Sequence, residues 1–579
     1  MKGVSALGLT GIVSSLAGCS GGQSRGEKVQ ELTFWSWPQD AKSQYTMSQL
    51  MRDGIEELGF EVDFRPVSRN RQIQKASVEL DFDFVTFGYT GRPQRIDPMA
   101  LAGRLYHKRE MPEGYNNPRY NSEKVNELIN EQKRTFDQDE RAKNVKQLQT
   151  MLMNPPDEQP DVENFEDGPG PILPAIHDHL LNMYNNANWE GFVQVPGLGL
   201  KNWWTWTGVK PKTDDKQLLA IYPSELEFSL SPLNSSEANR IAQRLIHDKL
   251  ARVGEDGLAK PSLAKDWEYA DDGSSVTYNL REGQKFHDGE PLTAEDVAFT
   301  FNYMKEWETP FYASAVTSMK KDGATAVDDT TVKIEFSEPD ATWDIVTAAR
   351  ITILPKHIWS NVPDNVSAAK PYEFSPTESE YGLIGSGPFQ FENWRRGDQI
   401  QLSVNSDHWM APEYDELVIN IVQNPSTRQS MMRNGNADFL VDATAGNPDL
   451  LEQMANESDS LTFVQSPNVG FQELTMNYVR PPMDDPNVRA ALACTIKKNI
   501  IKNEAFGGYA DIAHSFIHPA LEQWYNPDVF DYTSVGKEEG QKYLEEAGLI
   551  VADDGIYYPE GEVPPGSEKN KAYNQTDDS

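Results

Sequence analysis

The sequence predicts an α/β chain folded into more than one lobe. Its 579 residues are too many for a single small domain. In the first part of the chain short apolar strands alternate with helical stretches, as in the β-α-β run from Val29 to Val67. Hydrophobic residues make up 38% of the chain, which is enough to bury several cores. We therefore expect two or three lobes built on sheets that are covered by helices.

The first 28 residues predict an exported lipoprotein. Lys2 provides a minimal positive region, residues 4–16 are apolar, and Leu16-Ala17-Gly18-Cys19 resembles a lipobox. This predicts a signal peptide over residues 1–19, lipid attachment at Cys19 and a flexible tether over residues 20–28. The protein would then lie outside the cytoplasm, anchored to the outer face of the cell membrane. The alternative is a disordered or buried N-terminus that happens to carry a cysteine.

The part between residue 29 and the linker at residues 209–217 predicts half of an α/β lobe. We expect strands at residues 29–37, 60–67 and 82–89, and a helix between the first two that ends at Gly59. Two helices follow within residues 115–153, then an acidic loop rich in Gly and Pro, and one apolar strand over residues 172–184. The aromatic cluster Trp203-Trp204-Trp206 is expected to be buried or to lie where two lobes meet.

Residues 262–304 form the most ordered pattern of the chain. Trp267 and Tyr269 alternate with polar residues, Asp271-Asp272-Gly273 provides a turn, and alternation resumes at Val276, which predicts a hairpin. Thr293 stands where a helix N-cap is expected, with acidic residues in the first turn behind it. The segment therefore predicts a hairpin with one buried face, a second turn and an amphipathic helix.

As an ordered string this segment resembles the signature block of the solute-binding proteins of ABC importers for oligopeptides, dipeptides and nickel. Family-like motifs follow it in order: Leu354-Pro355-Lys356-His357, Gly385-Ser386-Gly387-Pro388-Phe389, Gly435 to Leu440, and Met476-Asn477 through Val488-Arg489. The resemblance implies an α/β, two-lobed periplasmic-binding-protein-like fold with three domains. It also implies capture of an extracytoplasmic solute by closure of the lobes.

The order of the blocks departs from the family. Pieces that resemble the last part of a family member come first here, and the chain ends where family members continue. We therefore expect a circular permutation within the last lobe, which an exposed loop can tolerate. The rival explanation is a truncated gene fused to a fragment of a relative. The expected domains are residues 29–208 as the relocated segment, 218–260 with 385–465 as a central domain, 261–384 as a small inserted domain, 466–550 as the rest of the last lobe, and 551–579 as a disordered tail.

The resemblance also suggests which residues face a ligand. The family blocks place Tyr89, Asp97, Asn234 and Trp394 near the walls of the cleft, together with Asn477 and Tyr478 at the start of the last lobe. Core packing is the alternative for each aromatic residue among them. Peptide-binding members carry an acidic residue in the loop where this chain has Arg92. An arginine there would repel an ammonium and favour a carboxylate or phosphate, so the solute is expected to be a peptide or an organic anion.

Composition and motifs limit the remaining functions. The net charge is −36, so the chain would repel nucleic acid. Because the acidity is spread along the chain, it favours a solvated surface suited to high salt over a field that attracts cationic ligands. The sequence holds no HExxH, GxSxG, P-loop or Cys/His cluster, so we expect no enzyme, metal or cofactor. Cys494 is the only cysteine besides Cys19, and four Asn-x-Ser/Thr sequons are weak indications of glycosylation: Asn234, Asn365, Asn456 and Asn574.

The expected partners follow from the resemblance. They are the solute, a membrane permease with a cytoplasmic ATPase, and the membrane itself through the lipid, with the protein acting as a monomer. The alternative function is a lipid-anchored surface receptor or scaffold that has lost transport.

Overall fold

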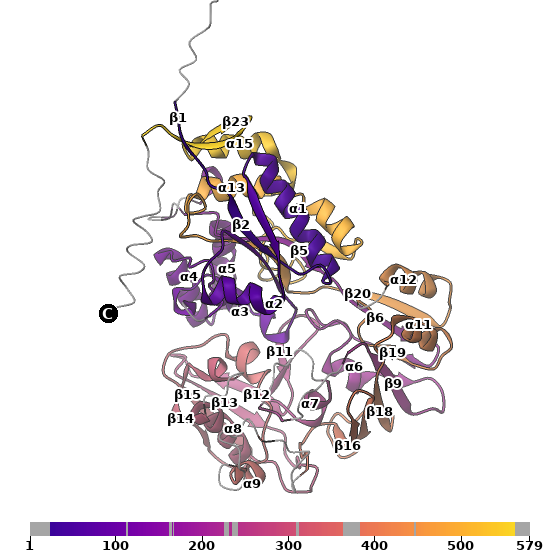
Figure 1. Cartoon of the computed structure of the whole chain (residues 1–579). Helices are drawn as coiled ribbons and strands as arrows, with labels where there is room; N and C mark the ends of the chain where they lie inside the picture. The colour runs from indigo at the N-terminus through magenta and orange to yellow at the C-terminus, as the bar shows by residue number, and fades with distance from the viewer. Residues whose placement is uncertain are drawn as a thin grey trace, which may run out of the picture.

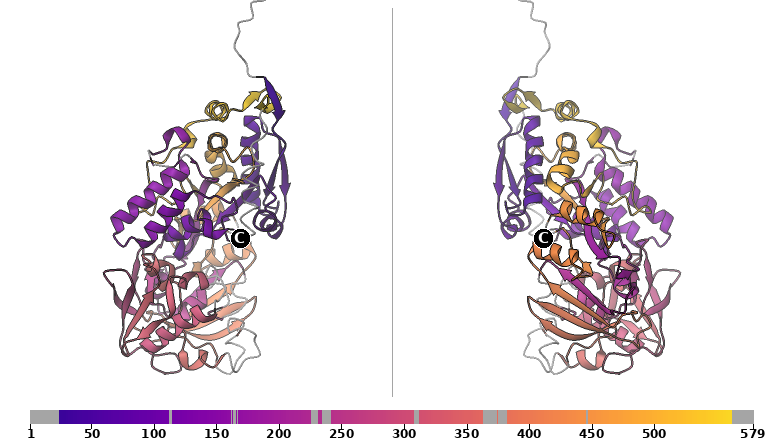
Figure 2. Two further views of the ribbon diagram at one scale, coloured as in Figure 1. Left: turned by 90° about the vertical axis from the view of Figure 1, so that its left-hand side faces the viewer. Right: turned by 90° about the vertical axis from the view of Figure 1, so that its right-hand side faces the viewer.

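The structure is a computed structural model that describes residues 24–561, apart from residues 112–113, 161, 163–164, 166, 225–230, 234–240, 308–311, 363–373, 375–381 and 445–446. Figure 1 and Figure 2 show two mixed α/β lobes, one above the other. The terminal lobe, residues 24–178 and 471–561, carries both described ends of the chain. The central lobe, residues 180–466, includes a small domain at residues 264–359. The chain crosses between the lobes twice, at His179 and at residues 467–470.

The terminal lobe is built on a six-stranded sheet. Its strands lie in the order β22 (Ala510–Ile512), β5 (Ile172–Asp178), β21 (Phe471–Met476), β4 (Phe84–Tyr89), β2 (Leu32–Ser36) and β3 (Val62–Pro66). The strands β2, β3 and β4 are parallel, and β21 runs antiparallel between β4 and β5. The predicted helix is α1 (Lys42–Leu58), which ends at Gly59 with a φ of 110°, a value that favours glycine.

The helices of the terminal lobe cover both faces of this sheet. On the α1 side α13 (Pro486–Thr495) packs against α15 (Lys537–Glu546). On the other side lie α3 (Met99–Leu105), α4 (Glu123–Arg134) and α5 (Gln138–Met153). Asp137 caps α5 by accepting a hydrogen bond of 2.9 Å from the backbone of Glu140. The helices α4 and α5 match the pair predicted within residues 115–153.

The central lobe is built on a seven-stranded sheet. Its order is β16 (Phe389–Arg395), β17 (Gln399–Val404), β18 (Glu416–Ile421), β9 (Gln217–Tyr222), β19 (Phe439–Leu440), β6 (Leu180–Asn185) and β20 (Leu461–Ser466). Around it lie α6 (Trp203–Gly208), α7 (Ile241–Ile246), α11 (Pro425–Arg433) and α12 (Pro448–Asn456). The single strand predicted over residues 172–184 is wrong, because the chain breaks at His179 and its two halves join the sheets of different lobes.

The small domain confirms the predicted hairpin and helix. Its sheet has the order β12 (Ala264–Tyr269), β13 (Ser275–Leu280), β15 (Thr331–Phe336) and β14 (Met319–Ala326), with Trp267 opposite Tyr278. The helix α8 (Ala294–Trp307) follows Thr293, whose backbone and hydroxyl donate to Asp296 at 2.9 and 3.2 Å. A short β10 (Ala251–Val253) and β11 (Ala259–Pro261) hairpin leads into this domain.

The two described ends of the chain pair with each other. A three-stranded sheet joins β1 (Arg25–Lys28) to β24 (Gly555–Pro559), which in turn pairs with β23 (Ile550–Ala552). The backbone of Glu560 donates to the carbonyl of Ser24 at 2.9 Å. Residues 25–28 therefore form a strand, although the sequence predicts a flexible tether over residues 20–28. The start of the tail is also ordered, because β24 lies beyond residue 550, where the sequence predicts that a disordered tail begins. Residues 562–579 of the predicted tail lie outside the described residues.

Candidate binding cleft between the lobes

A cavity of about 210 Å³ lies where the two lobes meet beside the crossing connections. It opens at the carboxyl ends of strands from both sheets, β4 in the terminal lobe and β9 and β19 in the central lobe. Such strand ends are the usual place for ligands in α/β proteins. The residues that line it include Thr90 and Gly91 from the terminal lobe, and Lys201, Tyr222, Arg244 and Asp442 from the central lobe.

A second hollow of about 430 Å³ continues this cleft. The two cavities share four lining residues, Asp178, His179, Leu181 and Thr444. The second extends between the lobes to Tyr509, whose hydroxyl lies 2.9 Å from a carboxylate oxygen of Asp449 and 2.8 Å from one of Glu452. Burial and these carboxylates raise the pKa of Tyr509, so it stays a neutral donor across the cleft. The two cavities together form the interlobe cleft.

The central-lobe wall of the cleft carries two cations and one carboxylate. The ammonium of Lys201 lies 5.6 Å from the ring centroid of Tyr222, and burial lowers the pKa of Lys201. Asp442 is close enough to oppose that shift, whereas Arg244 adds to it. The carboxylate of Asp442 also accepts hydrogen bonds from the backbone and hydroxyl of Thr444, at 2.9 and 2.5 Å. This wall can therefore meet an anionic group with Lys201 and Arg244, and a donor with Asp442.

The terminal-lobe wall is a loop held against the crossing connection. A side-chain carbon at Gly91 would lie 2.3 Å from Asn468 Oδ1 and 2.7 Å from the carbonyl of Gly197. Only glycine fits so close an approach. The same Oδ1 accepts a hydrogen bond of 3.1 Å from the backbone of Gly470. The loop after β4 thus packs closely against residues 467–470, one of the two connections between the lobes.

His179 bridges the lobes at the other crossing. Its Nδ1 lies 3.1 Å from the side-chain oxygen of Gln465 in the central lobe, and its Nε2 lies 3.1 Å from Asp511 in the terminal lobe. The bonds from His179 and His518 hold the pKa of Asp511 well below its usual range. Asp511 is therefore ionised, and it helps to fix the crossing segment at the base of the cleft.

Of the residues predicted to face a ligand, those in the loop after β4 come nearest to the cleft. Tyr89 is the last residue of β4, but its ring is buried, with its centroid 5.4 Å from that of Phe471. Arg92 follows directly on Gly91, which lines the cleft. The carboxylate of Asp97 is only 2% exposed, and both of its oxygens accept from Nη2 of Arg141, at 2.7 and 2.8 Å. That carboxylate is therefore engaged within the terminal lobe.

The other predicted residues lie elsewhere. Asn477 and Tyr478 follow the opposite end of β21, about 20 Å along the strand from the cleft. There Asn477 donates to the carbonyl of Phe82 at 2.8 Å, and the hydroxyl of Tyr478 donates to Asp167 at 2.7 Å. Trp394 belongs to the edge strand β16, where Arg396 lies over its ring at 4.6 Å. Asn234 and Cys19 lie outside the described residues.

Sequence reasoning missed the central-lobe wall, namely Lys201, Tyr222, Arg244 and Asp442. Tyr222 is the last residue of β9 and Asp442 lies two residues after β19, so the rule that ligands bind at carboxyl ends of strands could have singled them out. Lys201 carries no such signal, because it reaches the cleft from a loop before α6.

Three further features of the described residues concern membrane-spanning helices, metal sites and disulfide bonds. Within the described residues, none of the helices combines the length and the apolar character that a membrane crossing needs. The same part of the chain holds no group of three or more His, Cys, Asp or Glu side chains that could bind a metal ion. Cys494 is buried and free.

Comparison with known proteins identifies similar chains. The family profile described as bacterial extracellular solute-binding proteins, family 5, Middle, matches residues 259–578. The chain is 27% identical over 312 residues to the dipeptide-binding protein of Escherichia coli K12, covering 50% of this chain and 55% of the relative. It is 26% identical over 366 residues to heme-binding protein A of Haemophilus influenzae, covering 59% and 63%. The chain thus spans little more than half the length of these curated relatives.

Solved structures align over a similar share of the chain. The structure of NikZ from Campylobacter jejuni in complex with Ni(L-His) is 22% identical, with a TM-score of 0.45. The alignment covers 60% of this chain and 66% of that chain.

Proposed function

The chain belongs to the bacterial extracellular solute-binding proteins of family 5, and from that premise we propose that it captures a solute in the interlobe cleft and delivers it to a membrane permease. The curated relatives named above are a dipeptide-binding protein and a heme-binding protein. The proposed mechanism is closure of the lobes on the solute, with recognition of the closed form by the permease and energy from a cytoplasmic ATPase.

The observation that carries the proposal is a cavity walled by both lobes and flanked by the two crossings of the chain. Rotation about two short crossings can open such a cavity without unfolding either lobe. Closure removes water from the site, so a small solute can be held by a few well-placed polar groups. Thr90 and Gly91 on one side and Lys201 and Tyr222 on the other supply such groups.

The polar groups of the cleft favour a solute with at least one acidic group. Lys201 and Arg244 stand on the central-lobe wall, and Arg92 adjoins the loop on the other. Burial makes a positive charge costly, and an anionic ligand would offset that cost. Asp442 and Asp178 also line the cavity and could accept a hydrogen bond from a donor on the same solute, such as the amino group of a peptide or an amino acid derivative. The dipeptide-binding relative supports this class, because a dipeptide carries both an acidic group and a donor.

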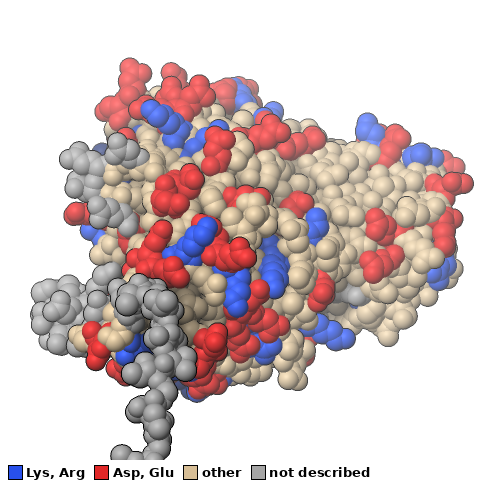
Figure 3. Space-filling view, turned by 90° about the horizontal axis from the view of Figure 1, so that it is seen from above, with Lys and Arg blue, Asp and Glu red and all other residues tan. Residues whose placement is uncertain are grey.

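The proposed anchor is a lipid on Cys19. The first described strand, β1, lies at the end of the terminal lobe that is farthest from the small domain, which would leave the cleft away from the membrane (Figure 1). On the face seen from that end, acidic side chains outnumber the basic ones that lie between them, as expected of a solvated surface (Figure 3). Substitution of Cys19 by serine is expected to release the protein from the membrane, and unchanged retention would contradict the anchor.

We also propose that the chain is a circular permutation of the family order. The pairing of β1 with β24 supports it, since these antiparallel strands lie like the two arms of one hairpin whose turn has been opened. The six-stranded sheet supports it too, because β21 from the late part of the chain lies between β4 and β5 from the early part. The pieces are complementary, as expected if each family block is present once.

Ligand-induced stabilisation tests the proposed function. A library of peptides, amino acids and organic anions would be screened by thermal unfolding of the soluble body, with Lys201→Gln as a matched variant. A ligand at a hundredfold excess over its dissociation constant stabilises the native state by about 2.7 kcal/mol. We expect a hit with an acidic group whose effect is lost in Lys201→Gln. Stabilisation that is equal in both proteins would place the ligand elsewhere, and a cooperative melt with no hit would favour the receptor or scaffold.

A further inference from the structure

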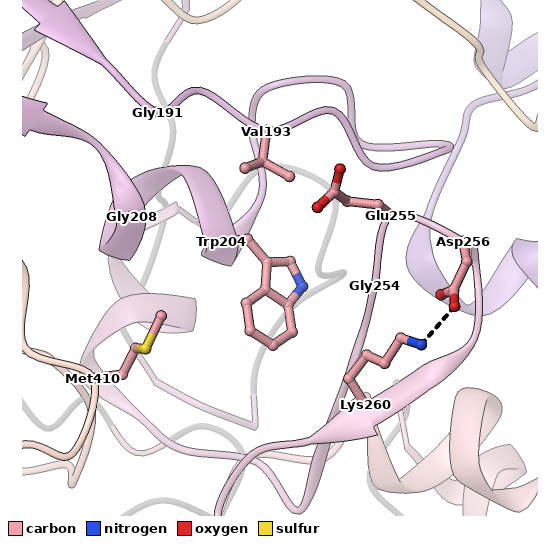
Figure 4. Close-up of a pocket in the computed structure, with 9 residues that line it drawn as sticks. All are labelled: Gly191, Val193, Trp204, Gly208, Gly254, Glu255, Asp256, Lys260 and Met410. Carbon is pink, nitrogen blue, oxygen red and sulfur yellow. Dashed lines mark hydrogen bonds and ion pairs between the residues drawn. The ribbon is translucent and has the colours of Figure 1, made fainter.

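A separate cavity, distinct from both hollows of the interlobe cleft, is lined only by residues of the central lobe. Its volume is about 460 Å³, within the usual range for small-molecule sites. Its lining comes from residues 191–208, from the tip of the β10–β11 hairpin and from Met410, and it shares no residue with the two hollows of the cleft. Figure 4 shows these residues arranged around an open space.

One side of this cavity is apolar and aromatic. Val193, Trp204 and Met410 are half-buried, so each keeps part of its surface toward the cavity. The indole of Trp204 is held in place, because its Nε1 donates to the carbonyl of Val253 at 2.7 Å. Trp203 packs against it at a ring-centroid distance of 4.9 Å. A fixed indole with accessible surface is the strongest cation-binding ring among the side chains.

The other side carries two adjacent carboxylates that differ in their partners. Asp256 accepts hydrogen bonds from the backbone of Leu258 at 3.1 Å and from Lys260 at 2.5 Å, so it stabilises the hairpin. Glu255 is exposed and makes no hydrogen bond or ion pair with the described residues, and in Figure 4 its carboxylate points from the hairpin toward Val193 and the space beside Trp204. The hairpin thus neutralises one negative charge and leaves the other facing the cavity.

We propose that this cavity is a second binding site, for a small organic cation. The ammonium head would lie between the face of Trp204 and the carboxylate of Glu255, and the apolar part of the molecule would contact Val193 and Met410. Trp204 attracts a cation through its ring quadrupole, and Glu255 through its charge. The cavity is large enough for a choline-sized molecule, whose methylated head needs no hydrogen-bond acceptors.

Gly208 provides a direct way to block the site. It lines the cavity at the end of α6, and a side-chain carbon built there would meet no atom within 4 Å. Its φ also lies outside the left-handed region, so a larger residue fits without backbone strain. Gly208→Leu is therefore expected to fold normally while its side chain occupies the space for the ligand.

Calorimetric titration of the full chain with choline at constant ionic strength tests the proposal. We expect choline to bind, and its uncharged isostere 3,3-dimethylbutan-1-ol to bind about tenfold more weakly. Glu255→Gln should weaken choline binding by about five- to tenfold, and Gly208→Leu should abolish it with an unchanged melting temperature. Lys201 lies in the interlobe cleft and does not line this cavity, so Lys201→Gln should stay within about twofold of the wild type.

Three results would overturn the proposal. They are no binding of choline by the wild type, equal binding of the uncharged isostere, or an affinity in Glu255→Gln that equals that of the wild type. If Lys201→Gln removed choline binding while Glu255→Gln kept it, the cation would belong to the interlobe cleft instead.

Discussion

The small domain is built on an antiparallel sheet and the terminal lobe on a mixed one, and their strands come from very different distances along the chain. In the small domain all four strands lie within residues 264–336, and Asn279 bonds Asp266 from only 13 residues away. In the terminal lobe Asn477 bonds the carbonyl of Phe82 from 395 residues away. Closing long loops costs entropy that only later contacts repay. The terminal lobe therefore depends on apolar packing and buried polar contacts between its early and late segments, whereas the small domain depends on local pairing.

The largest expected effect comes from removing the buried arginine that joins those segments. Arg489 is fully buried and donates to the carbonyls of Pro169, Met483 and Asp167, at 2.6, 2.9 and 2.8 Å. It also pairs with the carboxylate of Asp167 at 3.1 Å. Arg489→Leu removes the donor to these three carbonyls and the cation beside the Asp167 carboxylate, so we expect a loss of about 3–5 kcal/mol in urea unfolding.

The matched control is Arg480→Leu in the same lobe. Its side chain is 33% exposed and lies 3.3 Å from Asp81, so the loss should stay below about 1 kcal/mol. Equal losses in the two variants would mean that buried contacts between distant segments do not dominate the stability of the terminal lobe.

The two regions should also differ in their pH dependence. Glu473 in β21 is fully buried, and burial raises its pKa to about 8, while burial raises the pKa of Asp344 in the small domain to about 6. A raised pKa means that the folded state holds the proton longer than the unfolded state. The protonated carboxyl group therefore contributes its full stabilisation of the folded state below the pKa it has in the unfolded chain. This contribution is lost as the pH rises from that value through the pKa of the folded state. The window therefore runs from about pH 4.5 to 8 for Glu473 and from about pH 4 to 6 for Asp344.

Unfolding free energies measured across pH check this difference. We expect the Glu473 contribution to fall by about 3 kcal/mol between about pH 5 and 7.5, and Glu473→Gln to remove that slope. Asp344→Asn should leave the slope above about pH 6.5 unchanged, because its window is already passed. A Glu473→Gln variant with the wild-type slope would contradict the assignment.

A smaller effect concerns the contact between the two regions. Lys133 in α4 is 9% exposed and lies 3.0 Å from Glu338 and 3.7 Å from Asp340 of the small domain. The backbone of Ala341 also donates to the carbonyl of Lys133, at 2.8 Å. Because these bonds join the terminal lobe to the small domain, the proposed opening of the lobes would break them, and Lys133→Met should favour the open form by about 1 kcal/mol.

Fluorescence transfer between labels on the two lobes would measure that change. We expect the open fraction to rise about fivefold, and less so at high salt, where the ion pairs are screened. The control Lys542→Met removes an exposed ion pair within α15, 2.6 Å from Glu539, and should not change the open fraction. A similar rise in both variants would show a general effect of charge.

The smallest expected effect comes from restoring the family order of segments. In that variant a short turn joins Glu560 to Arg25, and new ends are opened within residues 212–215, which are exposed. Because the two joined residues already lie beside each other, we expect the unfolding free energy to change by no more than about 1 kcal/mol and the solute affinity to stay the same. Loss of cooperative unfolding would contradict the permutation.

The sequence by itself determined the structures that depend on neighbouring residues. The hairpin from Ala264 to Leu280 and the capped helix from Ala294 could be predicted, because turn residues, alternation and an N-cap act over a few positions. The α/β class and the family followed from the same local blocks. Asp97, by contrast, could not be assigned from its position in a loop, because its buried partner Arg141 lies 44 residues further along.

Only the tertiary structure decided where the candidate sites lie. The polar run His177-Asp178-His179 interrupts the apolar pattern of residues 172–184, but a short polar run does not show that the two halves join different sheets. Thr90, Lys201 and Asp442 meet at one cavity although they come from three distant segments. The same holds for Trp204 and Glu255, which line one cavity only because α6 packs beside the β10–β11 hairpin. A binding site is a property of positions in space, and local patterns fix the elements but not which of their ends and loops are brought together.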